Sequence, residues 1–203
     1  MRRVVVLALL ALALPMAAWA SGIDITNEFG TIAISNAGIS SKGSQLTSWG
    51  NQTGVHGSVS FTTGAMTSGS YLTGGTFSST GSTFVVLGVG QWAKTLTGQS
   101  KNPVTLFSGS FTGPINWTLT SQTANTKTFA LTGTIQGMLY DGRTVSGTTT
   151  QYFTATNRQW IAGRGHIMVG GSNLVVPEPG TLGLLGTGLV GIAGMFRRKL
   201  IGA

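Results

Sequence analysis

The chain has 203 residues, no cysteine, and a formal net charge of +8 from 12 basic and 4 acidic residues. The absence of cysteine excludes disulfide bonds, a thiolate nucleophile and cysteine-ligated metal sites. Charged residues make up 8% of the chain, against about 25% in an average soluble domain. This glycine-rich composition with few charged residues is typical of secreted surface proteins.

The first 20 residues have the three parts of a secretory signal peptide. Two arginines precede an apolar run over residues 4–14, and the small side chains of Ala18 and Ala20 follow. We therefore expect export across the inner membrane, with cleavage between Ala20 and Ser21. The alternative is a retained N-terminal membrane helix, which the short apolar run and the cleavage-type ending disfavour.

Residues 21–175 are expected to form one β-rich exported domain. Runs of β-branched and aromatic residues alternate with clusters of glycine, serine and asparagine, which is the pattern of strands joined by turns. The expected strands are 31–34, 55–61, 75–78, 83–87, 104–111, 115–120, 127–139, 143–154 and 159–169. No helix is predicted between residues 21 and 180. The fold class is therefore all-β, either an antiparallel sandwich or a curled antiparallel sheet, and the strand spacing does not separate the two.

Asp141 and Gly142 mark the turn of the clearest predicted hairpin. A two-residue loop would set the apolar face of the first strand against serine and threonine hydroxyls. A three-residue loop that includes Tyr140 instead brings Val145 and Phe153 onto the apolar face. Because a slip of one residue turns every side chain to the other face, we predict the second register. It requires a G1 bulge with Gly142 at positive φ.

The end of the chain, residues 176–203, combines three features. The first is the short peptide Pro177, Glu178 and Pro179. We expect it to be extended, because proline fixes φ and lacks a backbone N–H. The second is the uncharged run 181–196, about 24 Å of helix, which is short for a bilayer core. We expect a transmembrane helix there, and a buried core helix is the alternative. The third is a basic cluster of Arg197, Arg198 and Lys199. We expect it to stop transfer through the membrane and to stay on the cytoplasmic side.

This arrangement resembles the PEP-CTERM sorting domain, and the likeness covers only the tail. The resemblance implies that the tail is recognised by exosortase, a membrane enzyme that processes its substrate near the Pro-Glu-Pro motif. It also implies a bacterium with a double envelope, often one that makes exopolysaccharide or biofilm. The expected route is transient anchoring in the membrane, followed by release to the cell surface or extracellular matrix. The resemblance implies nothing about the activity of the β domain.

Few side chains in the exported domain could carry out catalysis. The titratable candidates are Asp24, Glu28, Asp141, His56 and His166. The first two could form the carboxylate pair of a glycosidase, but no further acid supports this, and neither histidine has a neighbouring carboxylate to complete a metal site. We therefore expect no enzymatic activity, no cofactor and no metal, and a hydrolase with an atypical site is the competing class.

Five of the twelve basic residues lie in the two terminal signals, so the high net charge does not indicate a nucleic-acid partner. The leading hypothesis is a structural surface or matrix protein that is associated with exopolysaccharide or biofilm. The alternative is a carbohydrate-binding or adhesive module in which exposed tryptophans contact sugars. The candidate tryptophans, each of which could equally lie in the core, are Trp49, Trp92, Trp117 and Trp160.

Overall fold

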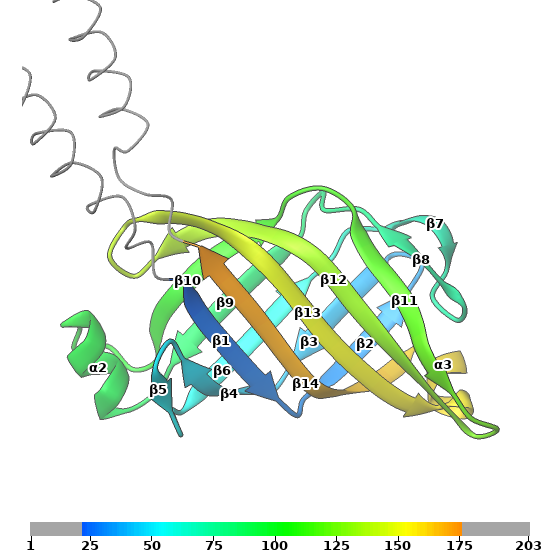
Figure 1. Ribbon diagram of the computed structural model, residues 1–203, viewed down its shortest axis with the longest axis horizontal. Coiled ribbons are helices and arrows are strands. Elements are labelled where there is room, and N and C mark those ends of the chain that lie inside the picture. Colours follow the sequence, from blue (N-terminus) through cyan, green and yellow to red (C-terminus); the bar gives the residue numbers. More distant parts are fainter. Residues whose placement is uncertain (1–21, 176–203) are drawn as a thin grey trace, which may run out of the picture. The chain divides into compact units, whose positions relative to one another are not determined.

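The structure is a computed structural model in which residues 22–175 are described. Several predicted features lie outside these residues: the cleavage site (Ala18, Ala20 and Ser21), the sorting motif (Pro177, Glu178 and Pro179), the apolar run 181–196 and the basic cluster (Arg197, Arg198 and Lys199). The described part is an all-β domain with two short helices (Figure 1). The all-β class predicted from the sequence is therefore confirmed.

The strands follow in chain order, and the helices lie in two of the loops. The strands are β1 (Ile23–Glu28), β2 (Thr31–Ser35), β3 (Gly38–Lys42), β4 (Ser44–Trp49), β5 (Gln52–Thr53), β6 (Gly57–Thr62), β7 (Met66–Ser70), β8 (Gly74–Phe77), β9 (Thr83–Gly88), β10 (Val104–Phe111), β11 (Ile115–Gln122), β12 (Thr126–Leu139), β13 (Thr144–Thr156) and β14 (Arg164–Val175). The helices are α2 (Gln91–Thr97) and α3 (Asn157–Ile161).

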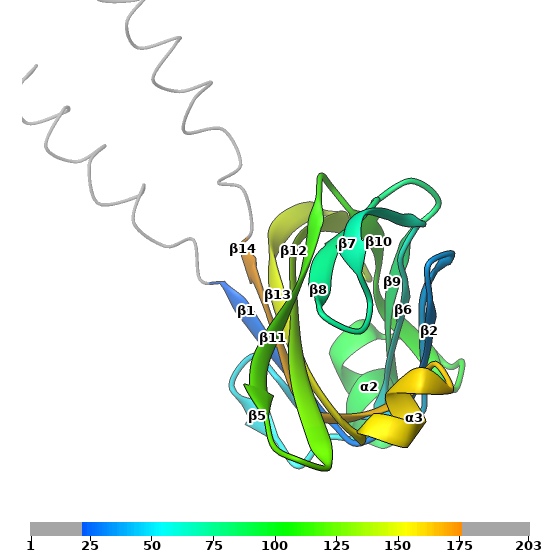
Figure 2. The same cartoon turned by 90° about the vertical axis from the view of Figure 1, so that its right-hand side faces the viewer.

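All these strands belong to one antiparallel sheet that closes on itself. Five pairs of consecutive strands act as long kinked runs: β1 with β2, β3 with β4, β6 with β7, β8 with β9, and β10 with β11. Each run pairs with the next, β12 and β13 follow, and β14 returns to pair with β1 and β2. The structure therefore corresponds to the curled-sheet alternative and not to two separate packed sheets (Figure 2).

The two ends of the described domain are neighbours. Ile23 at the start of β1 pairs with Leu174 near the end of β14. The chain therefore enters and leaves the sheet at the same end, where the loops containing α2 and the 140–143 turn also lie (Figure 1). Helix α3 lies at the opposite end, between β13 and β14.

A kink at Phe29 and Gly30 lets the first run bend while both halves stay paired with β14. Both residues have positive φ, 60° and 97° respectively. A Cβ on Gly30 would lie 2.6 Å from the backbone nitrogen of Ser44, so the close approach of the neighbouring strand requires glycine there. Phe29 is unusual, because a bulky side chain seldom adopts this left-handed conformation.

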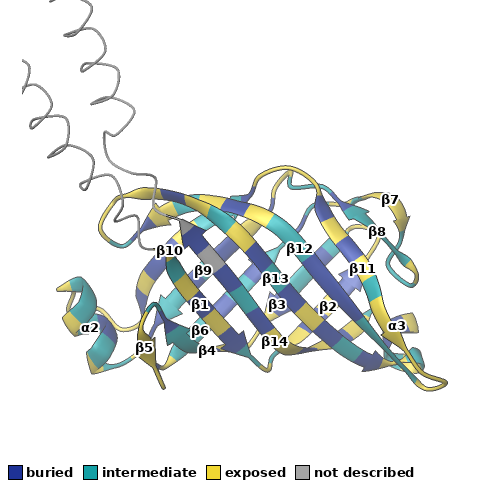
Figure 3. Cartoon of the chain, in the orientation of Figure 1, coloured by how far each residue is buried: buried dark blue, intermediate teal, exposed yellow. Residues whose placement is uncertain are grey.

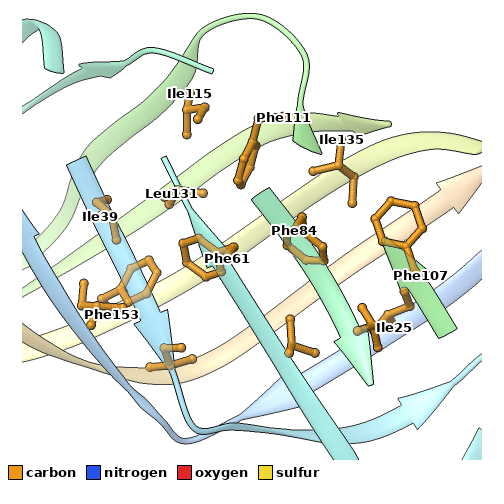
Figure 4. Close-up of a cluster of buried hydrophobic side chains, with 14 of the residues drawn as sticks. Ile25, Ile39, Phe61, Phe84, Phe107, Phe111, Ile115, Leu131, Ile135 and Phe153 are labelled. Carbon is orange, nitrogen blue, oxygen red and sulfur yellow. The ribbon is translucent and has the colours of Figure 1, made fainter. Parts of the chain in front are cut away.

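The interior is filled by side chains that alternate with exposed ones along the strands (Figure 3). Its centre is aromatic, and phenylalanines from opposite sides of the sheet point toward one another (Figure 4). The rings of Trp117 and Phe129 are stacked with centroids 4.7 Å apart, and Phe84 meets Phe107 edge to face at 6.1 Å. Each fully buried large apolar side chain contributes about 1.5–3 kcal/mol to folding, so this cluster is a main source of stability.

Helix α3 closes one end of the interior. Its residue Trp160 is 1% exposed, packs edge to face on Phe129 at 5.1 Å, and donates from Nε1 to the carbonyl oxygen of Lys127 at 3.0 Å. The helix begins with a capping box in which the hydroxyl of Thr156 accepts from the backbone of Gln159. The predicted strand 159–169 was therefore wrong at its start, because the capping box directs these residues into a helix.

The prediction of no helix between residues 21 and 180 was wrong in the loop before β10 as well. Helix α2 ends at Thr97 and is capped by Gly98, which has φ of 68° in the left-handed region that glycine tolerates. Asp24 and Glu28 lie in β1, which is paired with β14 on one side and with β4 on the other.

The hairpin of β12 and β13 has the predicted register. Gly137 pairs with Val145, Phe129 pairs with Phe153, and Gly142 has φ of 84°. The turn is further held by Arg143, whose Nε donates to Asp141 at 2.7 Å. This guanidinium holds the pKa of the Asp141 carboxyl below its usual value, chiefly through that hydrogen bond.

Candidate functional site

The titratable side chains predicted as catalytic candidates do not converge. His56 precedes β6 at the end of the domain that carries α2, and its carbonyl accepts from Trp92 Nε1 at 3.0 Å. His166 lies on β14 beside α3, at the other end of the domain. Asp141 is paired with Arg143 in its turn. Across residues 22–175, no group of three histidine, aspartate or glutamate side chains is placed to hold a metal ion.

Three of the four candidate tryptophans are core residues. Trp49, Trp117 and Trp160 are 5%, 1% and 1% exposed, and Trp92 is half-buried. The hypothesis of sugar contact through exposed tryptophans was therefore wrong for these three side chains. The large exposed aromatic side chains of the described domain are instead Phe29, which is 61% exposed, and Tyr152, which is 43% exposed.

A buried polar network joins the first and last parts of the sheet. The amides of Asn27 and Gln151 form two reciprocal hydrogen bonds of 3.0 and 3.1 Å. Asn27 also donates to Ser44 Oγ at 2.7 Å, and Gln151 donates to Thr149 Oγ1 at 3.2 Å. Both amide side chains are fully buried, and a Cβ on Gly170 would overlap the Gln151 amide. Since each amide is satisfied within the protein, the network is structural and aligns the strands that close the sheet.

A groove of about 470 Å³ lies on the outer face of the sheet, where β2, β3 and the start of β14 meet α3. Its polar and charged lining comes from all four elements: Thr31 from β2, Ser40 and Lys42 from β3, Gln159 from α3, and Arg164 and His166 from β14. The strand register orders them into two rows. One row is His166, Thr31 and Lys42, and the next is Arg164, Ala33 and Ser40.

The groove presents hydrogen-bond donors and positive charge. Lys42 and Arg164 are exposed, and neither forms a salt bridge within residues 22–175. The amide oxygen of Gln159 accepts from the backbone of Thr156 at 2.9 Å, which turns the amide nitrogen toward His166 Nε2 at 3.3 Å. The donor and acceptor roles of the His166 ring nitrogens depend on its tautomer: in the form that accepts at Nε2 from Gln159, Nδ1 carries the proton and can donate to a ligand. Sequence reasoning missed this groove because its residues come from distant parts of the chain.

The comparisons with known proteins concern the tail. Residues 175–199 match the family model described as the PEP-CTERM protein-sorting motif. The matched stretch contains Pro177, Glu178, Pro179, Arg197, Arg198 and Lys199. This confirms the resemblance seen in the sequence and supports exosortase-dependent sorting of an exported protein.

Neither the curated proteins nor the solved structures contain a match to this chain. Among residues 22–175, none of the helices is both long and apolar enough to cross a membrane. The predicted span at about 181–196 lies outside the described residues.

Proposed function

We propose that this protein is a structural component of the cell surface or extracellular matrix, delivered there by exosortase and associated with exopolysaccharide or biofilm. The observation that carries the proposal is the sorting-motif match at residues 175–199. In this proposal the signal peptide directs export, and the apolar run and basic cluster hold the chain in the inner membrane. The β domain is then displayed and performs no catalysis, consistent with titratable groups that do not converge.

The architecture of the domain is compatible with removal of the tail. The last strand, β14, ends at Val175 and is paired with β1 and with β13. The sorting motif begins at Pro177, beyond the last strand. A cut near this motif therefore removes no strand from the closed sheet, and the released domain keeps its core and its buried polar network.

The test is mass spectrometry of the mature C-terminus in strains with and without the exosortase. We expect a C-terminus near Pro177 only where the enzyme is present. Replacing Glu178 by alanine should preserve the tail, whereas replacing the exposed Gln136 of β12 by alanine should leave processing unchanged. An intact tail through Ala203 in both strains would defeat the proposal.

A separate measurement tests the non-enzymatic part of the proposal. The purified full chain is incubated with a panel of polysaccharides, and released reducing ends are measured. We expect none above background. Hydrolysis that is lost when Asp24 and Glu28 are replaced by their amides would establish the competing hydrolase class.

A further inference from the structure

We propose that the groove beside α3 binds an acidic polysaccharide, through carboxylate groups carried on successive sugar units. This inference rests on the proposed function and names the chemical class of its partner. It begins from the lining of the groove, in which Lys42 and Arg164 supply positive charge and Thr31, Ser40 and His166 supply hydrogen-bond donors. Within the described domain, no carboxylate lines the groove. Such a surface favours anionic oxygen atoms over neutral or cationic groups.

The spacing of the cations favours a polymer over a small anion. Lys42 lies on β3 and Arg164 on β14, with β2 between them. Two strand spacings separate the backbones of these two residues by roughly 10 Å across the sheet, and their rows are offset by about 7 Å along it. When both side chains extend away from each other, their charges lie too far apart for the two oxygens of one carboxylate to contact both. The two cations therefore fit separate anionic groups on one linear chain, with the small side chains of Thr31 and Ala33 as the floor between them.

An exposed aromatic and aliphatic strip borders the groove on the same face. Tyr152 lies two residues along β13 from Thr154, which pairs with His166. Tyr152 itself pairs with Val169, and Glu28, the residue before Phe29, pairs with Val169 from the other side. The strip consists of Phe29, Tyr152, Met168 and Val169, and all four side chains are exposed. Aromatic faces of this kind pack against the apolar faces of sugar rings, which a simple inorganic anion does not offer.

The conformation of Phe29 is a second, independent indication. Its φ of 60° is one that glycine or asparagine would adopt more readily, and its side chain is 61% exposed. The ring therefore gains little from burial in the domain. A sparsely populated backbone conformation at an exposed aromatic residue is the kind of outlier that accompanies binding sites. We assign to Phe29 a contact with the sugar chain.

The groove lies away from the end of the domain at which β14 finishes. Arg164 opens β14, whereas Val175 ends it and leads into the sorting motif. The eleven intervening residue steps correspond to about 36 Å of strand. The groove therefore lies far along the domain from the point where the chain continues into the tail.

The binding experiment uses the full chain in detergent, with polygalacturonate as the acidic probe and dextran as the neutral one. We expect saturable binding of polygalacturonate that weakens as salt increases, and much weaker binding of dextran. The double variant K42Q/R164Q should weaken polygalacturonate binding roughly fivefold to tenfold, as expected for two exposed ion pairs. The variant F29N, which keeps the backbone conformation accessible, should weaken it about threefold.

Matched controls separate the site from general charge effects. The double variant K94Q/K101Q removes the same charge near the other end of the domain and should change the affinity less than twofold. The variant E28Q removes a carboxylate from the outer face near the strip and should tighten binding. Circular dichroism on every variant establishes that the sheet is retained.

The outcomes distinguish the groove from the broader function. Binding that K42Q/R164Q and K94Q/K101Q weaken equally would overturn the groove assignment and leave the association with polysaccharide in place. Absence of binding to both polysaccharides would overturn both the groove and that association, although exosortase processing would stand. Tighter binding of a single-stranded DNA oligonucleotide than of polygalacturonate would overturn the choice of partner.

Discussion

Replacing Gln151 by methionine should destabilise the domain substantially, although the two side chains have similar length. The substitution removes the three hydrogen bonds that Gln151 makes to Asn27 and Thr149. The hydroxyl of Thr149 keeps its hydrogen bonds to Gly171 and Ser172, so it is not left without a partner. The amide oxygen of Asn27 loses its donor in a fully buried position. A buried polar group left unpaired costs about 1–3 kcal/mol, and with the other lost bonds we expect a decrease of about 2–4 kcal/mol in the free energy of unfolding.

Urea unfolding of the full chain in detergent measures this effect. The unfolding midpoint should fall while the dependence of the unfolding free energy on urea concentration stays unchanged. The matched control is Gln136→Met, the same exchange at an exposed position of β12. Its free energy of unfolding should lie within about 0.5 kcal/mol of the value for the unmodified protein. The double variant N27L/Q151M removes both amides and should be less destabilised than the sum of its single variants. A Q151M variant as stable as Q136M, or a strictly additive double variant, would refute the role given to the network.

Three further predictions concern the fold. Gly30→Ala should lower the free energy of unfolding by more than about 2 kcal/mol, because a Cβ there meets the backbone of the neighbouring strand. Gly142→Ala, which has open space around the new Cβ, should lower it by about 1 kcal/mol. Urea unfolding midpoints compare the two variants, and equal losses would contradict the argument from close approach. Trp160→Ala should cost about 3–5 kcal/mol and lose near-ultraviolet circular dichroism, since it empties one end of the core. Asp141→Asn should lower the free energy of unfolding by less than about 1 kcal/mol near neutral pH. Because the pKa of Asp141 is lowered in the folded protein, this loss of stability should be present above about pH 4. It should vanish as the pH falls through the folded pKa. A difference that grows on acidification would contradict the pairing with Arg143.

The second half of the sheet could be predicted because its pattern is regular. Along β12 and β13, apolar side chains alternate with threonines over long strands, and only one turn length brings Val145 and Phe153 to the apolar face. In these two strands, the apolar side chains that the alternation marks as inward-facing are buried in the folded domain. The register therefore follows from the sequence.

Strands β1, β3 and β4 could not be predicted because polar residues occupy inward positions in each of them. Asn27, Ser41 and Ser44 are buried, which breaks the apolar alternation that identifies a strand. The partner of Asn27 is Gln151, and nothing local in the sequence links them. Helix α3 did carry a signal, since Thr156 and Gln159 have capping-box spacing, but its β-prone surroundings suggested a strand.

The groove could not be predicted for a related reason. Lys42 and Arg164 become neighbours of the same strand, β2, only when the last strand closes the sheet. Before closure they are isolated basic residues in a chain of low charge. The sorting tail, by contrast, is a continuous stretch that can be identified without knowledge of the fold.

The pairing of Ile23 with Leu174 also has a consequence for the timing of folding. An exported chain emerges with its N-terminus first, and its early strands can form hairpins with their immediate successors. The ring of strands, however, cannot be completed until β14 has emerged, since β14 supplies a partner for β1, β2 and β13. This closing step joins residues far apart in the chain, so we expect it to be the slow step of folding. Because the sorting tail follows β14 directly, we expect the final folding step to coincide with arrival of the tail at the membrane.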